Sequence, residues 1–378
     1  MVRRDAAARL RNPARAYDRA AVSEFAHPEE LEQLRAEASR FAAAELAPAA
    51  RAAERGGNWP DHALAVLEKF GLPELDLPEA LGGLGPGAET KAGLLEALAS
   101  GDAGGLFAAD PLGPALGAHA GCPDRARARE LAGLALAREG RSVLLVADPD
   151  AAPPLRVPWA PSRPPLRFVW SSAGAELALL ELAAAAEPVN ALAFHASGGV
   201  TASLAGARRL GEWRLPTLES VAVRGRARLW TAAVALGVAQ AAFDATVAYT
   251  RERIVFGKPV AHHQGNAFEL AVAATNLHGA RLLVHDAARG FDRGDPDDGF
   301  WATQAWLGAI DAAVAVTDLG VQLLGGHGFL VDHLAEKRFR EVRMLALLAG
   351  GRDAAEVDVA ELVLDVPDPL FGAEGALQ

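Results

Sequence analysis

The sequence has very little cysteine, few aromatic residues and no excess of basic charge. A single cysteine, Cys122, occurs in 378 residues, which excludes an internal disulfide and any zinc or iron–sulfur site built from several cysteines. Lys and Arg number 37 against 48 Asp and Glu, a formal net charge of −11, so a broad basic face for nucleic acid is not expected. No uninterrupted apolar run reaches the ~18 residues of a membrane-spanning helix. We therefore expect a cytoplasmic protein without a membrane or nucleic-acid partner.

Apolar residues, alanine above all, are what the sequence has in abundance. Hydrophobic residues make up 51% of the chain and charged residues 22%, which is enough apolar surface to offset the ordering entropy of a folded core. Aromatic residues contribute only 6%, whereas alanine runs such as 183–186 are frequent. Because alanine has the highest helix propensity and a small side chain, this composition predicts a helix-rich protein with closely packed helices.

Hydrophobic periodicity divides the chain into four parts. Residues 1–27 show no steady period, and we expect them to form a flexible N-terminal arm. Apolar residues at three- and four-residue steps predict an N-terminal α-helical domain over 28–140. Short apolar runs separated by proline clusters predict a reduced middle β domain over 141–223. Long helical patterns return over 224–378 and predict a C-terminal four-helix bundle.

The fold class predicted by these patterns is mainly α with a small β domain. In the N-terminal part, helices are expected over 31–46, 61–70 and 88–99, with Pro48 stopping or kinking the first. In the middle part, strands are expected at 143–146, 168–170, 191–194 and 221–223, while 176–186 fits a strand or a helix. In the C-terminal part, helices are expected over 229–249, 263–291, 299–324 and 354–363.

Several segments rich in glycine or arginine occur in a set order along the chain. They read PEALGGLG at 78–85, YTRERIVFGKPV at 249–260, HQ at 263–264, VQLLGGHGF at 321–329 and EKRFREVR at 336–343. Each segment alone is a weak signal, but their order and spacing together are specific. Over most of residues 28–365 the sequence thereby resembles the acyl-CoA dehydrogenase family, which implies a helical domain, a β domain and a helical bundle.

Two of these segments carry side chains and backbone suited to a dinucleotide. The guanidinium of Arg253 can hold a pyrophosphate with two hydrogen bonds, and the ring of Phe256 can lie beside a planar heterocycle. From the residues alone, an arginine in a surface ion pair next to a core phenylalanine is the favoured interpretation. The glycines at 325, 326 and 328 permit positive φ and close backbone approach to a ligand, or they simply end a helix.

The resemblance implies an FAD-dependent oxidoreductase of lipid metabolism that acts on the CH–CH group of an acyl-CoA or related thioester. It implies a role in binding FAD for Arg253, Phe256, Gln264, Gln322, Gly325 and Gly326. Of these, Gln322 and Gly326 would reach the adenine end of a neighbouring subunit's FAD, which requires a homodimer or homotetramer. Arg228 is implied at the substrate, and no metal site is expected.

The sequence departs from the family at the position of the catalytic base. The family's reaction removes a proton α to the thioester carbonyl while a hydride leaves the β carbon for the flavin, and this needs a carboxylate. The resemblance places that carboxylate at 349, or in some members at 227, and Ala349 and Ala227 stand there. The middle part also lacks the family's flavin-binding segments, so FAD contacts are expected to be reduced or lost.

Other carboxylates near these motifs are weaker candidates for a base. Glu341 aligns with a structural aspartate beside Arg340, Glu252 follows a helix end, and Asp332 lies after the glycine turn. Three functions therefore stay open. The chain is a dehydrogenase with weak or absent activity in isolation, a non-catalytic paralogue that pairs with an active subunit, or a flavin-dependent relative with oxygenase-type chemistry.

Overall fold

A computed structural model describes most of the chain. The described residues are 29–85, 87–150, 155–157, 165–189 and 191–364. The arm expected over 1–27 lies outside these residues. Within them the chain is mostly helical with a small sheet region, so the predicted fold class, mainly α with a small β domain, is confirmed.

Short helices and helical turns build the N-terminal part. They are α2 (Glu29–Phe41), η3 (Ala42–Leu46), α3 (Ala47–Gly56), α4 (Asp61–Glu68), η4 (Glu79–Leu81), α5 (Ala88–Ala99), α6 (Gly104–Ala109), η5 (Gly113–Ala115), α7 (Leu116–Gly121) and α8 (Arg125–Leu136). Pro48 does not end the first helical stretch, because it lies in the first turn of α3, where a missing N–H costs no hydrogen bond. The chain passes from α2 to α3 through the π turn η3. The helix expected at 88–99 is α5.

Two small sheets follow. The first has strand order β1-β3-β4-β7, formed by β1 (Arg141–Leu145), β3 (Leu166–Ala173), β4 (Glu176–Glu181) and β7 (Arg208–Arg214). Strands β1 and β3 are parallel, and the other pairs are antiparallel. The second has order β2-β6-β5, formed by β2 (Leu155–Val157), β6 (Val200–Ala202) and β5 (Glu187–Pro188). The ambiguous stretch 176–186 therefore begins as a strand.

The prediction of a strand was wrong for two segments, 191–194 and 221–223. Residues 191–194 belong to no strand and lead into the helical turn η6 (His195–Ser197), with Phe194 in the left-handed region at φ +59°. Residues 221–223 lie inside α9 (Thr217–Glu252). A short apolar run looks the same in a buried strand and in a helix that is buried all round, and the first turns of α9 are of the second kind.

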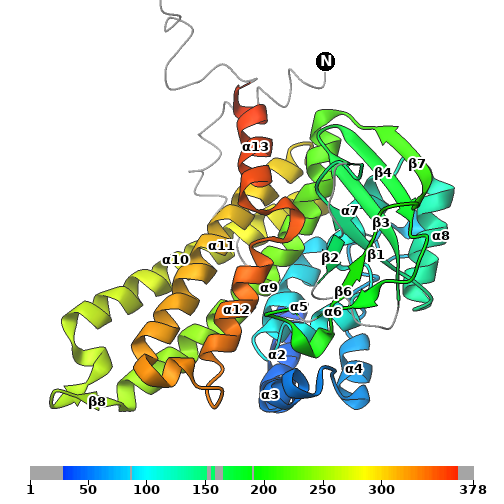
Figure 1. Cartoon of the computed structure of the whole chain (residues 1–378). Coiled ribbons are helices and arrows are strands. Elements are labelled where there is room, and N and C mark those ends of the chain that lie inside the picture. Colours follow the sequence, from blue (N-terminus) through cyan, green and yellow to red (C-terminus); the bar gives the residue numbers. More distant parts are fainter. Residues whose placement is uncertain (1–28, 86, 151–154, 158–164, 190, 365–378) are drawn as a thin grey trace, which may run out of the picture.

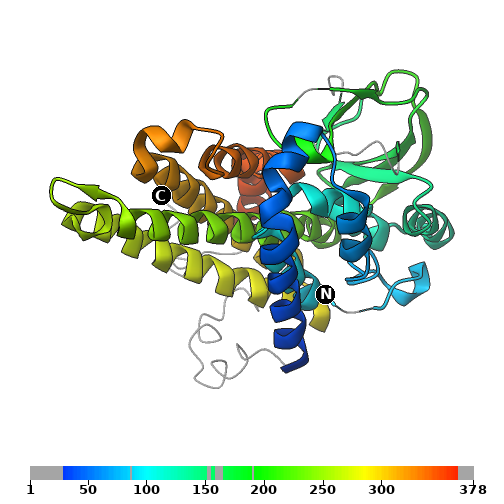
Figure 2. The same cartoon turned by 90° about the horizontal axis from the view of Figure 1, so that it is seen from below.

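The C-terminal part is a bundle of long helices. Its elements are α9, the hairpin β8 (Ile254–Val255) and β9 (Lys258–Pro259), η7 (Val260–His262), α10 (Gln264–Arg293), α11 (Asp298–Leu324), η8 (Gly325–Phe329), α12 (Ala335–Leu345), η9 (Leu348–Gly350) and α13 (Gly351–Leu364). Figures 1 and 2 both show the hairpin at the end of the bundle that points away from the sheets. Helix α12 was not expected, because its sequence is mostly charged.

Helix α9 is the centre of the molecule and packs on both α5 and α11. At Gly237 a Cβ atom would lie only 2.1 Å from the Glu96 carbonyl oxygen, so glycine is what lets α9 approach α5 this closely. By length and composition, α9 and the stretch Asp298–Phe329 could each cross a membrane. In this structure they pack against each other, and 61% of the apolar window of α9 is buried, as expected of a core helix.

Candidate functional site

The two positions at which a catalytic carboxylate was expected lie on α9 and η9, which contact each other. Ala227 is buried in α9, and Ala349 is buried in η9 with φ +53°. Between them, Nη2 of Arg228 lies 3.5 Å from the carbonyl oxygen of Ala349, 121 residues along the chain. The fold thus brings the two segments that carry these positions together, and neither alanine side chain can accept a proton.

Arg228 is not free to meet a substrate, because a buried carboxylate already holds it. Its Nη1 donates to Asp358 Oδ2 at 2.6 Å and to Thr303 Oγ1 at 3.0 Å, and its side chain is fully buried. Burial lowers the pKa of this guanidinium, while the charge of Asp358 partly opposes that effect. The role at the substrate implied for Arg228 stays a prediction.

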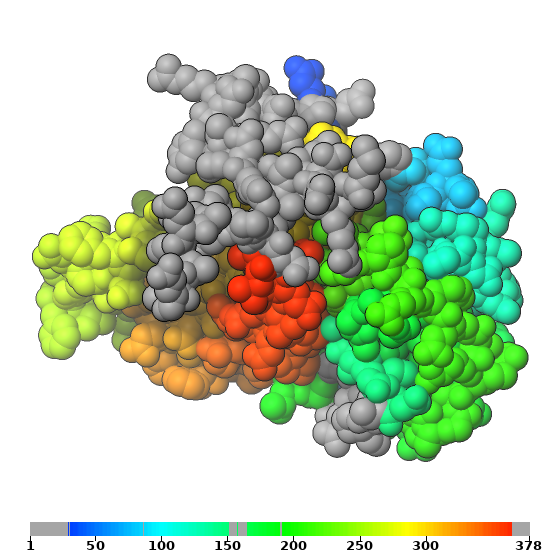
Figure 3. All heavy atoms as spheres, turned by 90° about the horizontal axis from the view of Figure 1, so that it is seen from above, coloured from blue at the N-terminus to red at the C-terminus, as the bar shows by residue number. Residues whose placement is uncertain are grey.

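Asp358 also binds a second arginine, Arg224. Asp358 was not identified from the sequence as part of this site. Arg224, one turn before Arg228 on α9, donates from Nε to Oδ2 at 2.8 Å and from Nη2 to Oδ1 at 2.6 Å. Asp358 comes from α13, which lies between the bundle and the strands in Figure 3. It falls one turn after the buried Ala355, and an acidic residue on a buried helix face was the signal available.

The residues implied to bind FAD lie at the far end of the bundle. Arg253 caps α9 and is exposed, and Phe256 in the hairpin is 94% exposed with φ +51°. The remaining positions are also exposed, at the start of α10 and around the end of α11: Gln264, Gln322, Gly325 and Gly326. Tyr249 ties the end of α9 to η8, because its hydroxyl lies 2.9 Å from His327 Nδ1. We refer to the six residues implied to bind FAD as the bundle-end group.

The bundle-end group lies far from the alanines of its own chain. Ala227 and Arg253 are 26 residues apart on one helix, which at 1.5 Å per residue is ~39 Å. The two ends of this stretch of α9 are therefore too far apart to line one compact site on this chain. The bundle-end group and the alanines are therefore two separate centres on this chain.

The bundle-end group suits the phosphate and adenine parts of FAD. In the described part of the chain, the side chains of Arg253 and Gln322 have no hydrogen bond or ion pair, so their donors are available to an incoming ligand. The strands, in contrast, offer little to a flavin ring. The buried hydroxyls of Ser142, Ser171 and Ser172 are already used by His119, the Ala147 carbonyl and Arg224 respectively.

Glu341 has the structural role expected of it but a different partner. It forms an ion pair with Lys337, which also pairs with Asp102, and all three are buried. Burial raises the pKa of Glu341, and Lys337 opposes that shift. Arg340 pairs instead with Glu54 and Glu336. The other two candidate bases, Glu252 and Asp332, are both exposed.

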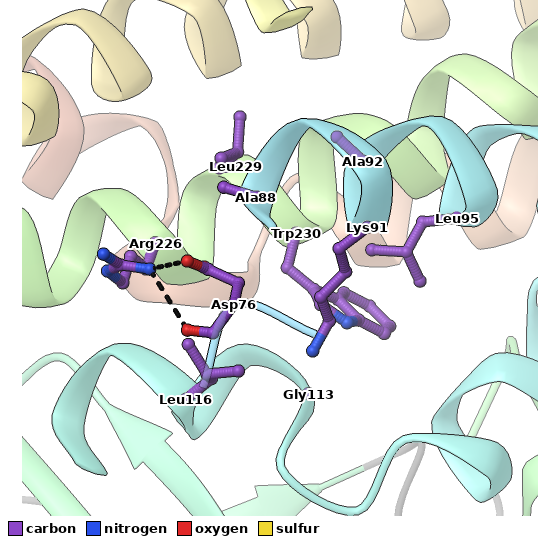
Figure 4. A pocket seen from close by; sticks show the side chains of 10 residues that line it. All are labelled: Asp76, Ala88, Lys91, Ala92, Leu95, Gly113, Leu116, Arg226, Leu229 and Trp230. Carbon is purple, nitrogen blue, oxygen red and sulfur yellow. Dashed lines mark hydrogen bonds and ion pairs between the residues drawn. The ribbon is translucent and has the colours of Figure 1, made fainter. Parts of the chain in front are cut away.

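A small pocket with room for little more than a water molecule lies between α5, η5 and α9, and Figure 4 shows its lining. The Asp76–Arg226 ion pair is on one side of it, and burial raises the pKa of Asp76 although Arg226 opposes the shift. A second, smaller pocket adjoins Lys337 and Glu341. Neither of these two pockets is lined by Ala227 or Ala349.

Comparison with known proteins gives a consistent picture. The chain is 34% identical to 3-(aryl)acrylate reductase of Clostridium sporogenes over 155 residues, which is 41% of each chain. It is 26% identical to the probable acyl-CoA dehydrogenase FadE25 of Mycobacterium tuberculosis, over 90% of this chain and 97% of that one. Its fold matches the ChsE4–ChsE5 complex of Mycobacterium tuberculosis with a TM-score of 0.70 at 20% identity, covering 91% of this chain and 100% of that one.

Two family models match the regions on either side of the strands. Residues 28–121 match the acyl-CoA dehydrogenase N-terminal domain, and residues 224–364 match the acyl-CoA dehydrogenase C-terminal domain. Together these regions make up more than half of the 378 residues. They include all the bundle segments that carried the resemblance in the sequence. The chain belongs to the acyl-CoA dehydrogenase family.

Proposed function

We propose that this chain is a non-catalytic subunit of an acyl-CoA dehydrogenase-type flavoprotein and works together with a homologue that has the base. The observation that carries the proposal is alanine at both 227 and 349, on the contacting elements α9 and η9, beside an arginine, Arg228, that is already paired with Asp358. Dehydrogenation of an acyl-CoA needs a group that takes the α proton, and an alanine methyl cannot do so. The isolated chain is therefore expected to have little or no dehydrogenation activity.

The bundle-end group is what this chain contributes to the shared assembly. FAD, when bound, supplies the hydride acceptor. Arg253 would pair with its pyrophosphate, Phe256 would lie beside a ring, and Gln322 would donate to the adenine end. Their exposure, and their distance from the alanines, favour an FAD held mainly by the partner. The ChsE4–ChsE5 structure is by its title a complex of two proteins, and a similar pairing is proposed for this chain.

Expression of this chain alone, and together with a glutamate-bearing homologue, tests the proposal. The purified chain alone should be inactive on acyl-CoA substrates, whereas the complex should be yellow and active. Arg253→Met in this chain should lower the FAD content and turnover of the complex. Lys258→Met is the matched control, because Lys258 is an exposed cation on the same hairpin.

Two results would contradict the proposal. Robust acyl-CoA turnover by the isolated chain, abolished when flavin is removed, would show that a base exists elsewhere in it. A complex whose FAD content is the same with Arg253→Met and Lys258→Met would show that the bundle-end group does not reach the cofactor. Sedimentation of each preparation separates these outcomes from a failure of the two chains to associate.

A further inference from the structure

Helix α10 carries large apolar side chains on the side that faces away from the rest of the bundle. Its buried residues, such as Leu277 and Val284, belong to the core that α10 shares with α5, α9 and α11. On the opposite side, Phe268 is 61% exposed, Val272 is 59% exposed and Leu283 is 53% exposed. Figure 2 shows this helix, in yellow-green, along the outer edge of the bundle. Exposed apolar side chains that gather on one face indicate an interaction surface.

The exposed residues of this face follow helical spacing and form one continuous line, which we call the α10 stripe. Its members are exposed and recur at steps of three or four residues: Phe268, Val272, Thr275, Gly279, Leu282 and Leu283. The stripe is ~22 Å long at 1.5 Å per residue. Its two ends carry large side chains and its middle carries small ones. A Cβ atom at Gly279 would meet no described atom within 4 Å, so the middle is open to close approach by another helix.

This order of side-chain sizes is complementary to itself. If two copies of α10 stack antiparallel about a two-fold axis at the middle of the stripe, Phe268 of each copy meets Leu282 and Leu283 of the other. Thr275 then lies next to the axis, where a small side chain allows the two helices to approach closely. A two-fold contact of this kind uses the same surface on both copies, so each apolar end of the stripe is covered.

The charges beyond the two ends of the α10 stripe fit the same antiparallel arrangement. Before α10, the side chains of Arg251, Arg253 and Lys258 are exposed and have no ion pair in the described part of the chain. At the other end, residues 286–298 contain five aspartates and two arginines. Antiparallel stacking places the basic end of each copy beside the acidic end of the other. Parallel stacking would place like charges together, which is unfavourable.

We propose that α10 is the contact surface for a second copy of this chain, which binds antiparallel through the α10 stripe. Burial of Phe268, Val272 and the two leucines drives the association, because it removes exposed apolar surface from water. The opposite charges at the two ends set the orientation. The contact needs neither FAD nor a homologous subunit, so it does not rest on the proposed function.

Sedimentation of the purified full chain, without any other protein, tests the contact. The chain should sediment as a dimer. Val272→Glu should weaken dimerisation by about tenfold or more, because the dimer would bury the new carboxylate without a partner. Val357→Glu on α13 is the matched control and should leave the dimer unchanged, since Val357 is 54% exposed and Val272 is 59% exposed. Circular dichroism of both variants establishes that each is folded.

Cysteine cross-linking tests the antiparallel orientation separately. The one native cysteine, Cys122, is buried, so an introduced cysteine on α10 is the accessible thiol. Thr275→Cys places the thiols of two copies next to the two-fold axis, and oxidation should give a covalent dimer. Asp286→Cys is the matched control and should not cross-link, because the antiparallel order separates its two copies by ~30 Å along the helices.

Three results would each overturn the proposal. A full chain that sediments as a monomer would show that α10 does not bind a second copy, and this result is also expected if a different protein covers the stripe. Equal dimerisation of Val272→Glu and Val357→Glu would show that two copies meet elsewhere. Cross-linking of Thr275→Cys that is no faster than that of Asp286→Cys would exclude the antiparallel pairing.

Discussion

Replacing Asp358 by asparagine removes the negative charge that Arg224 and Arg228 share. In the native chain three donor–acceptor pairs of 2.6–2.8 Å join this carboxylate to the two guanidinium groups. Asparagine has nearly the same shape but is neutral, and its amide group would point N–H donors at arginine donors. The variant therefore leaves two buried guanidinium groups without a counter-charge.

The expected cost follows from the burial of all three side chains, none of which is more than 8% exposed. Removing one partner of a buried ion pair costs about 3–5 kcal/mol, because the remaining charge has no compensation. Arg224→Met should cost less, below about 2 kcal/mol, because it leaves Asp358 and Arg228 as a neutral pair. The order of the two variants is thus as informative as the size of either.

Urea unfolding followed by circular dichroism measures these differences, as a shift of the midpoint at an unchanged slope. Asp353→Asn is the matched control on the same helix. Asp353 is exposed and has no ion pair in the described part of the chain, so a change within about 0.5 kcal/mol is expected. The reasoning would be refuted if Asp358→Asn were no more destabilising than Asp353→Asn, or less destabilising than Arg224→Met.

Two further predictions concern stability. Burial lowers the pKa of His119 from 6.5 to about 4. Because the unfolded chain takes up this proton at a higher pH than the native chain, the free energy of unfolding should fall by about 3 kcal/mol between pH 6.5 and pH 4. His119→Gln should remove this acid-dependent loss in urea titrations at several pH values, whereas replacement of the exposed His278 should not. Gly237→Ala should cost about 1–3 kcal/mol or more, because its methyl would collide with the Glu96 carbonyl. Gly279→Ala, with open space around it, should be neutral or stabilising by thermal unfolding, and equal melting temperatures for the two variants would disprove the contact.

Helices with a strong apolar period were predictable within a few residues. The expected helix over 263–291 is observed as Gln264–Arg293, and that over 299–324 as Asp298–Leu324. The start of α9 was placed twelve residues too late, because its first turns carry arginines that are buried rather than solvated. Helix α12 was missed for a related reason: charged residues such as Lys337 lie on its buried side.

The two parts of the candidate site differed in how far they could be predicted. Ala227 and Ala349 could be singled out because a resemblance assigns a chemical need to those positions. Asp358 could not, because a charged residue in one sequence reads as solvent-exposed unless its burial is known. The charge balance of a buried cluster depends on which side chains meet, and these come from distant segments of the chain.

The sequence by itself determined the helical character of the protein, its family and the loss of a carboxylate at both expected base positions. These are properties of residue type and spacing, which local propensity and motif order express directly. Only the tertiary structure decided that Arg228 is held by Asp358 and that the bundle-end group lies ~39 Å along α9 from Ala227. Burial and proximity decide these points, because a charge's partners and its cost depend on the segments packed around it.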